Sequence, residues 1–249
     1  MQKKLLKYII VVVITLMFSF NLSMAEDGID NTIYAQLLTK HVKNARVHYD
    51  GFKKDEALLD EYLAVLSSTN VKSLAGNRRF AFYINAYNAF TIKLVLTKFP
   101  GINSIKEIGG FFSSPWGKKF ILLNGRTVSL DHIEHDILRH EFNDPRVHFA
   151  INCASKSCPP LLNTPYKAEI LEKQLDSQAI KFINDKKNTF IKGDTLFISK
   201  IFSWFKKDFS NNPLLFIRKY ALGELKAQLD SKAGTIKIKY LYYDWSLNR

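Results

Sequence analysis

Residues 78–99 constrain the fold more than any other stretch of this chain. Apolar side chains recur here at helical spacing, and residues 80–92 carry no charge at all. A helix that is apolar on nearly every side has to be surrounded by the rest of the protein. Pro100 and Gly101 follow it and favour its termination. The sequence therefore predicts a long helix buried at the centre of the fold.

Two asparagines, Asn85 and Asn88, interrupt the apolar surface of this helix. At 100° per residue both share a face with Ala81, Ala89 and Ile92, so we do not expect them to point into solvent. A buried amide without a hydrogen-bond partner costs about 1–3 kcal/mol. Both side chains therefore need partners, which are either the backbone of a loop or the side chains of a site that they orient.

The rest of the chain alternates between helical patterns and short extended ones. Asn124-Gly125 between two apolar runs is a strong hairpin signal, and Gly193-Asp194 marks a second hairpin in residues 189–199. Residues 47–51 and 236–245 have extended patterns. Helical spacing is found in residues 30–43, 55–66, 129–142, 165–185, 199–209 and 212–229.

Regular alternation of strand and helix is missing from this order of elements, which argues against a parallel α/β sheet. No repeat, low-complexity tract or long linker divides the chain. The expected fold class is therefore α+β, a single mainly helical domain with hairpins and a small mixed or antiparallel sheet.

The helix expected at residues 129–142 carries a carboxyl group close to its buried side. On the helical wheel Glu134 lies at the edge of the core face, beside Leu130 and Ile137. His135 and Arg139 point away from that face. A carboxylate in this position needs a partner, and we expect an arginine or histidine from another element.

The stretch RVHFAINCASKSCPP, which begins at Arg146, holds the two cysteines of the chain, Cys153 and Cys158. Its alternation of apolar and polar side chains predicts a strand that breaks into a loop closed by two prolines. With a period of two, Arg146, His148 and Asn152 share the face opposite Cys153. We expect this polar face to line a cleft.

Three interpretations of the cysteines remain open. An even number of cysteines in an exported protein favours a Cys153–Cys158 disulfide. Because this bond would close only a small loop, it would stabilise the folded state by only roughly 2 kcal/mol. As a catalytic thiol, Cys153 would use His148 as its base and Glu134 or an asparagine as the orienting group. A straight strand, however, would place His148 and Cys153 on opposite faces. A metal site with these residues fits no common zinc spacing, so we expect neither a metal nor another cofactor.

The N-terminus has the pattern of a secretory signal peptide. Three lysines precede an apolar run over residues 8–20, and Ser23-Met24-Ala25 supplies a small-x-small cleavage site. The run is shorter than the roughly 20 residues that a membrane-spanning helix needs. We therefore expect cleavage after Ala25, no stable membrane span afterwards, and a secreted or periplasmic domain of residues 26–249.

The chain is basic, with 36 Lys and Arg against 23 Asp and Glu and a formal net charge of +13. Removing the three lysines of the signal peptide leaves +10. The basic residues are scattered rather than gathered on one helical face, which is typical of a solvated surface. Such a surface also favours anionic envelope ligands by long-range attraction. No nucleic-acid-binding motif is present, so nucleic acid is not an expected partner.

Five stretches, taken in order, identify a family resemblance. They are FYINAYNAF at residues 82–90, SLDHIEHDILR at 129–139, DPRVHFAINCASKSCPPL at 144–161, FSWFKKDF at 202–209 and YDWSLN at 243–248. With these, the chain resembles the domain-of-unknown-function family 547, whose members are exported bacterial proteins and domains of larger plant and animal proteins.

The resemblance implies no particular activity, because none is assigned to that family. Its intracellular members are similar around the positions that match Cys153 and Cys158. A purely structural disulfide explains this poorly, so the resemblance favours a functional thiol.

Two functions are thus expected to compete for one polar cleft. The first is a hydrolase or transferase that acts on a small molecule or an envelope component, with Cys153, His148 and Glu134 as catalytic residues. The second is a non-catalytic module that binds an anionic ligand and is stapled by a disulfide. The binding residues expected around the cleft are Asn85, Asn88, Arg139, Arg146, Asn152 and Cys158.

Overall fold

The long central helix is present as α5, Gly76–Leu96, and every residue from Phe80 to Ile92 is buried. The computed structural model describes residues 29–110, 113–232 and 234–249. The signal peptide predicted for residues 1–25 lies outside the described residues. Among the described helices, none combines the length and the apolar character that a membrane crossing requires.

The elements confirm an α+β fold in which helices predominate. Its helices are α2 Thr32–His41, α3 Tyr49–Lys54, α4 Glu56–Ser68, η1 Val71–Ser73, α5 Gly76–Leu96, η2 Ile105–Ile108, η3 His132–Arg139, α6 His140–Phe142, α7 Val147–Ala150, η4 Ala168–Ile170, α8 Leu171–Ile183, α9 Ile201–Trp204, α10 Pro213–Tyr220 and α11 Gly223–Ser231. Its strands are β1 Val42–Lys43, β2 Arg46–Val47, β3 Ile121–Leu123, β4 Arg126–Val128, β5 Thr189–Lys192, β6 Thr195–Ile198 and β7 Lys237–Tyr240.

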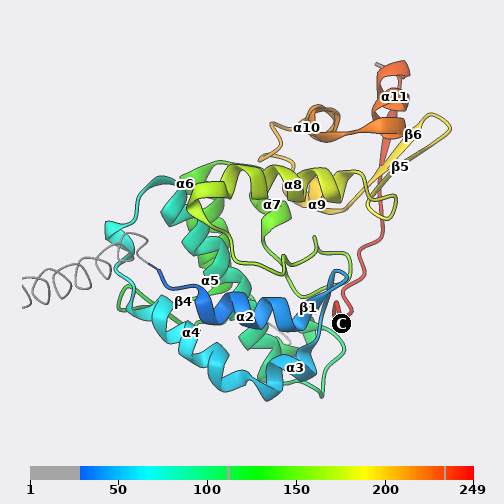
Figure 1. Ribbon diagram of the computed structural model, residues 1–249. Helices are drawn as coiled ribbons and strands as arrows, with labels where there is room; N and C mark the ends of the chain where they lie inside the picture. The colour runs from blue at the N-terminus through cyan, green and yellow to red at the C-terminus, as the bar shows by residue number, and fades with distance from the viewer. Residues whose placement is uncertain (1–28, 111–112, 233) are drawn as a thin grey trace, which may run out of the picture. The chain divides into compact units, whose positions relative to one another are not determined.

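Helix α5 is enclosed by elements from both halves of the chain. Helices α3 and α4 and the helical segments η2, η3 and η4 contact it, and α2 packs against α4. Figure 1 shows α5 in the middle, with α2 and α4 below it and α8 above it. The absence of charge in its central turns is explained by this enclosure, because no side of the helix meets water there.

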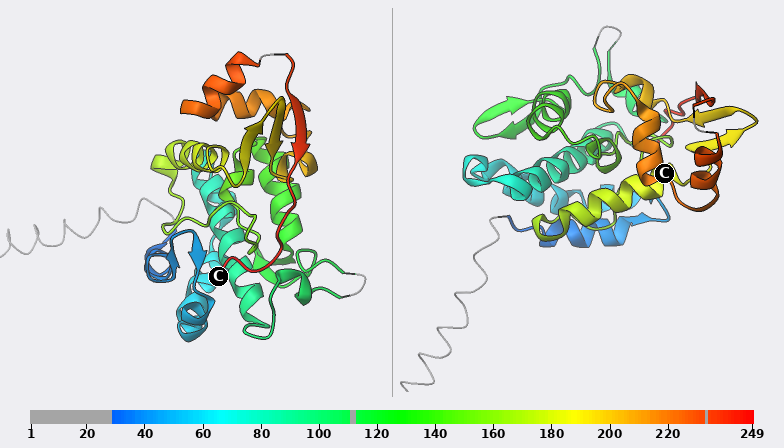
Figure 2. Two further views of the ribbon diagram at one scale, coloured as in Figure 1. Left: turned by 90° about the vertical axis from the view of Figure 1, so that its right-hand side faces the viewer. Right: turned by 90° about the horizontal axis from the view of Figure 1, so that it is seen from above.

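Both predicted hairpins are confirmed. In the β3–β4 hairpin, Asn124 and Gly125 have φ angles of 53° and 69°, the left-handed conformation that a type I′ turn needs. The β5–β6 hairpin turns at Gly193 and Asp194, and β7 adds to it in parallel, pairing with β6. Figure 2 shows these three strands side by side, with the C-terminal segment continuing from β7. Residues Asn31–Arg249 form one compact unit.

Two shorter predictions need correction. The helix expected over residues 212–229 is broken into α10 and α11, because Ala221 and Leu222 adopt extended backbone between them. The extended piece expected at residues 47–51 ends after Val47, and α3 begins at Tyr49.

The strand expected from Arg146 onward is also wrong, because the chain forms the single helical turn α7 before it extends. Asp144 starts this turn: its side chain accepts the N–H of Arg146 at 2.9 Å and its carbonyl accepts the N–H of Val147 at 3.1 Å. The backbone becomes extended only at Ile151. The period of two therefore does not apply to His148 and Cys153, and the two side chains are not held on opposite faces.

The two asparagines of α5 bind main chain, one of the two roles expected for them. Asn85 exchanges two hydrogen bonds with the backbone of Tyr166, each 2.9 Å long. Asn88 donates to the carbonyl of Ala150 at 3.0 Å and accepts the N–H of Asn152 at 2.8 Å. Each amide thus acts as a backbone-like bridge between α5 and a distant segment, and Asn88 fixes the chain just before the cysteines.

The Asn88→Ala variant is expected to be less stable by about 2–4 kcal/mol, since it leaves a buried carbonyl and a buried N–H without partners. Urea denaturation followed by circular dichroism measures the difference. Asn163→Ala, at an exposed asparagine, is the matched control and should change stability by less than about 0.5 kcal/mol. Equal effects of the two substitutions would contradict the anchoring role of Asn88.

Candidate functional site

A pocket of about 180 Å³ brings together ionisable groups and aromatic rings from distant parts of the chain. Its ionisable and sulfur-containing residues are Asp131, Glu134, His135, His148, Cys153 and Cys158. Its aromatic residues are Tyr87, Trp116, Trp204, Phe205, Tyr243 and Trp245. A concave, largely apolar pocket with a few converging polar groups is the usual form of a small-molecule site.

Four of the nine predicted site residues line this pocket: Glu134, His148, Cys153 and Cys158. The other five contact protein groups and are not among its lining residues: Asn85, Asn88, Arg139, Arg146 and Asn152. Of the six expected binding residues, the pocket therefore includes only Cys158, and the other five bind protein groups instead.

The Cys153 sulfur lies 3.2 Å from each of two hydroxyl oxygens, those of Ser155 and Tyr243. Burial raises the pKa of this thiol, but hydrogen bonds from Cys158, Ser155 and Tyr243 outweigh that effect and hold its pKa below the ordinary value. Cys158 shifts in the opposite direction, because burial and the neighbouring Cys153 both raise its pKa. Of the two sulfurs, Cys153 is the one that the site favours as a thiolate.

Both cysteines are free thiols in this structure. The main-chain N–H of Cys153 donates to the sulfur of Cys158 at 2.8 Å, so the two residues are held close along one wall of the pocket.

The backbone directly after Cys153 is strained. Ala154 has a φ of +64°, a left-handed conformation that costs a residue with a Cβ about 1 kcal/mol or more. Asn152 accepts the N–H of Ala154 at 2.9 Å and donates to the carbonyl of Pro159 at 2.7 Å. Asn248 adds a backbone N–H to the Ala154 carbonyl at 3.1 Å and a side-chain bond to Asn152. These bonds keep Cys153 at a sharp turn that faces the pocket.

His148 is buried and has the environment of a neutral base. Its Nε2 lies 2.7 Å from Asp208 Oδ2, and its ring stacks on Phe205 with 4.0 Å between centroids. Burial lowers the pKa of His148, with the Asp208 carboxylate opposing the shift. Because a carboxylate can only accept, we assign the proton of the neutral ring to Nε2, which leaves Nδ1 as an acceptor. No hydrogen bond joins His148 to Cys153 within the described part of the chain.

Asp208 connects His148 to Arg139 and is the principal site residue that sequence reasoning missed. Arg139 donates to both carboxylate oxygens, at 2.6 and 2.9 Å, and also bonds His135 Nδ1 at 2.8 Å. Burial raises the pKa of Asp208, but its bonds from His148 and Arg139 lower it well below the ordinary range. The signal that could have identified Asp208 is the stretch FSWFKKDF, where it is the single acidic residue among aromatic and basic ones.

The segment η3 is a π-helix, and its geometry changes which side chains reach the pocket. The helical turn that leads into it starts at Leu130, and the hydroxyl of the preceding Ser129 accepts the N–H of His132 at 3.1 Å. A π-helical turn contains more residues than an α-helical turn, so the angular positions drift away from the α-helical wheel. His135, predicted to point away, consequently lines the pocket together with Glu134.

Glu134 is a buried carboxyl group whose direct partner is a tyrosine rather than the expected arginine or histidine. Tyr87 of α5 donates its hydroxyl to Glu134 Oε2 at 2.9 Å. Burial raises the pKa of Glu134 to about 7, although His135, the Tyr87 hydrogen bond and Arg139 all oppose this shift. Near neutral pH, Glu134 is therefore a group that can both give and take a proton.

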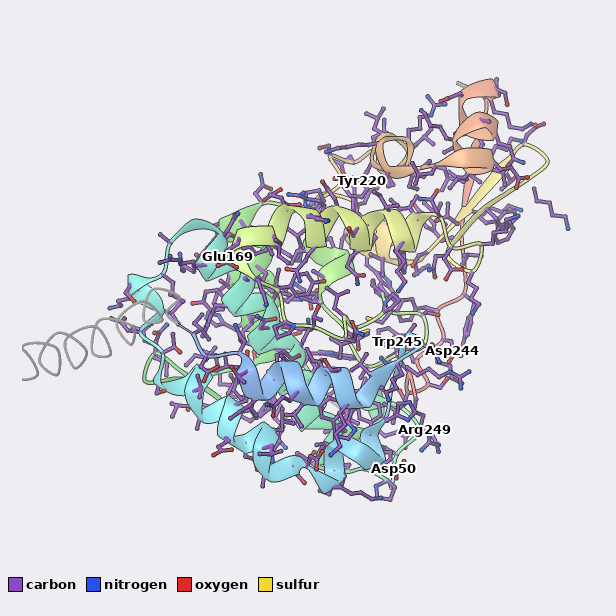
Figure 3. The ribbon with its side chains drawn as sticks, viewed as in Figure 1. Asp50, Glu169, Tyr220, Asp244, Trp245 and Arg249 are labelled. Atoms are coloured by element: carbon purple, nitrogen blue, oxygen red, sulfur yellow. The ribbon has the colours of Figure 1, made fainter. Side chains whose placement is uncertain are left out.

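Arg146 has a structural role away from the pocket. Its guanidinium bonds Asp144, Glu172 and Asp176 at 2.5, 2.7 and 2.9 Å. Tyr220, labelled in Figure 3, also donates to Asp176, at 2.9 Å, and so ties α10 to the same cluster. Three carboxylates already compensate the charge of Arg146, which leaves it poorly suited to hold an anionic ligand.

Residues 71–183 match the model of a family described as a protein of unknown function, DUF547. This confirms the resemblance seen in the sequence motifs. The matched segment contains Glu134, His148 and both cysteines, whereas Asp208 and the C-terminal aromatic residues lie beyond it. No curated protein and no solved structure matches the chain.

The Glu134→Gln variant is expected to be more stable than the parent protein at pH 8 and about equally stable at pH 4. The folded protein keeps the Glu134 proton up to about pH 7, whereas the unfolded chain loses it near the ordinary value of 4.5. Between these values the folded state binds more protons, so the stability of the parent falls as pH rises, by on the order of 3 kcal/mol in total. In Glu134→Gln the side chain is neutral at every pH, so this decrease in stability with rising pH is absent.

Urea denaturation of both proteins at one-unit intervals from pH 4 to pH 8 measures the effect. Glu169→Gln, at the exposed carboxyl labelled in Figure 3, is the control for removing a surface charge and should change stability by less than about 0.5 kcal/mol. Parallel pH curves for the parent and Glu134→Gln would show that Glu134 is ionised in the folded protein.

Proposed function

We propose that the pocket is the active site of an exported cysteine-dependent acyl-transfer enzyme, a hydrolase or transferase that acts on a small molecule or an envelope component. The environment of Cys153 carries this proposal: two hydroxyls stabilise its thiolate at the wall of a ligand-sized pocket. The thiolate, not the thiol, is the nucleophile in such chemistry. The signal-peptide pattern of residues 1–25 supports the extracytoplasmic location.

In the first step, the Cys153 thiolate attacks the carbonyl carbon of the substrate. A carbon–sulfur bond forms, the bond to the leaving group breaks, and the leaving group departs with the electron pair. Glu134, which burial keeps protonated up to about pH 7, supplies the proton that the leaving group needs. The products of this step are a thioester on Cys153 and the Glu134 carboxylate.

In the second step, His148 activates water or another acceptor. Its Nδ1 takes the proton of the acceptor, which attacks the thioester and releases the Cys153 thiolate. Asp208 holds the imidazole in the required tautomer and stabilises its positive charge, as the 2.7 Å contact allows. His148 then passes the proton that it took from the acceptor to Glu134, which restores both groups. The absence of a Cys153–His148 hydrogen bond from the described residues agrees with this division, because the hydroxyls, not the imidazole, activate the thiol.

The size of the pocket limits the substrate. A cavity of about 150 Å³ accepts benzene, and this pocket measures about 180 Å³. The reacting part of the substrate is therefore about the size of one ring or one amino-acid side chain. The alternative of a module that grips an anion through Arg146 has less support, since that arginine is already paired with three carboxylates.

Acylation of Cys153 is the direct test of the proposal. Residues 26–249, treated with p-nitrophenyl acetate, are expected to release a burst of nitrophenolate stoichiometric with the protein and to carry an acetyl group on Cys153, identified by peptide mass spectrometry. Cys153→Ser should abolish the burst. Cys158→Ala should still acylate at Cys153, but more slowly because one hydrogen bond to the thiolate is lost. Equal release by the parent and Cys153→Ser would sink the proposal.

Asp208→Asn separates the two steps. The substitution disturbs the tautomer of His148, so turnover of the thioester is expected to fall by about 10²–10⁴-fold, while the acylation burst is retained. Pre-steady-state and steady-state rates of nitrophenolate release measure both steps in one experiment. A burst that slows as much as the turnover would instead assign His148 to activation of the thiol.

A further inference from the structure

All three tryptophans of the chain line the same pocket. Trp116 lies in the loop before β3, Trp204 ends α9, and Trp245 lies in the C-terminal segment after β7, where Figure 3 labels it. Three segments that are far apart in sequence thus each deliver their tryptophan to one place. This convergence suggests that the aromatic walls have a purpose beyond filling the core.

The rings meet at inclined angles rather than in a flat stack. Trp245 lies 5.6 Å from Trp116, 5.5 Å from Trp204 and 4.6 Å from Tyr243, measured between ring centroids. Trp204 and Tyr243 are 4.8 Å apart, at 59°. Ring planes inclined to one another in this way present π faces in several directions around a corner of the pocket.

The charge of the pocket walls is unusual for this chain. The protein has 36 lysines and arginines, yet none is among the described residues that line the pocket, whereas two carboxyl residues, Asp131 and Glu134, are. Asp131 is about two-fifths exposed, and among the described residues its ion-pair partner is His135, whose Nε2 lies 3.8 Å away. Two cations that are not lining residues lie over rings of the pocket, Lys106 over Trp245 and Arg139 over Phe205. A ligand cation would find a carboxylate in Asp131.

An ammonium group is already bound by this aromatic cluster. The Nζ of Lys106 lies 4.1 Å from the centroid of the Trp245 ring, within the distance at which a cation is attracted to a π face. The cluster therefore already accommodates a positive charge on the ring of Trp245.

We infer that the pocket binds a positively charged ligand group, an ammonium or trimethylammonium, against its tryptophan faces and beside Asp131. Several inclined aromatic rings and a carboxylate are the features that recognise such cations. The inference deepens the proposed function, on which it depends for regarding the ligand as a substrate. The enzyme would then act on acyl compounds that carry a cationic head group, and neutral analogues of the same shape would bind poorly.

Choline and its uncharged carbon analogue, 3,3-dimethylbutan-1-ol, provide the test. They have the same shape and differ in charge, and the fluorescence of the protein comes from three tryptophans that all line the pocket. Titration of residues 26–249 is expected to give a saturable change with choline, with isothermal calorimetry as the second measurement. The neutral analogue should bind at least about ten-fold more weakly. Equal affinities would overturn the inference in favour of a purely apolar pocket, and so would a lack of choline binding.

Substitutions locate the binding. Asp131→Asn removes the carboxylate at a partly exposed position and is expected to weaken choline binding several-fold, with little effect on the neutral analogue. Trp245→Leu should weaken choline binding by about ten-fold or more, and Trp245→Phe, which keeps a π face, should recover part of the loss. Similar losses for Leu and Phe, or no change with Asp131→Asn, would contradict the assigned contacts.

Cys153→Ser keeps this test independent of the thiol chemistry. The variant has no nucleophile, but it keeps the three tryptophans and Asp131, so it should still prefer choline to the neutral analogue. In the parent protein, choline binding without acylation of Cys153 would contradict the proposed function and support the cation site. Acylation of Cys153 without a preference for choline over its analogue would support the proposed function and contradict the cation site.

Discussion

The position of Cys153 depends on one buried amide. Asn88 is part of the helix that every other layer encloses, and it binds the carbonyl of Ala150 and the N–H of Asn152. These bonds fix the chain on both sides of Ile151, where α7 ends and the extended segment begins. Asn152 then holds the strained turn at Ala154. The backbone strain of that turn is offset by a series of hydrogen bonds that begins at the buried central helix.

The site is completed from the other end of the chain. The C-terminal segment runs along the cysteine loop: the N–H groups of Lys156 and Ser157 bind the carbonyls of Ser246 and Asp244 at 2.8 and 3.2 Å. This pairing brings the Tyr243 hydroxyl to the sulfur of Cys153 and the Trp245 ring to the pocket. One short segment therefore contributes both to the surroundings of the thiol and to the aromatic wall of the pocket.

Sequence reasoning found residues that share one pocket but not how they are arranged. Glu134, His148 and Cys153 were identified from polar groups in apolar surroundings, and all three line the pocket. The strand predicted around them was wrong, because Asp144 starts a helical turn that an alternating pattern cannot reveal. The orientation of His135 was wrong for a similar reason, since a π-helix has a different period from the wheel used to place it.

By itself, the sequence determined the buried helix, the two hairpins and the mainly helical α+β class, because these depend on local periodicity and turn residues. It also marked the cysteine stretch as a candidate site through its composition. Only the tertiary structure decided the partners: Asp208 for His148, Tyr87 for Glu134, and Tyr243 for Cys153. Such pairs are separated by 47 to 90 residues, and contacts at that separation leave no periodic signal in one sequence.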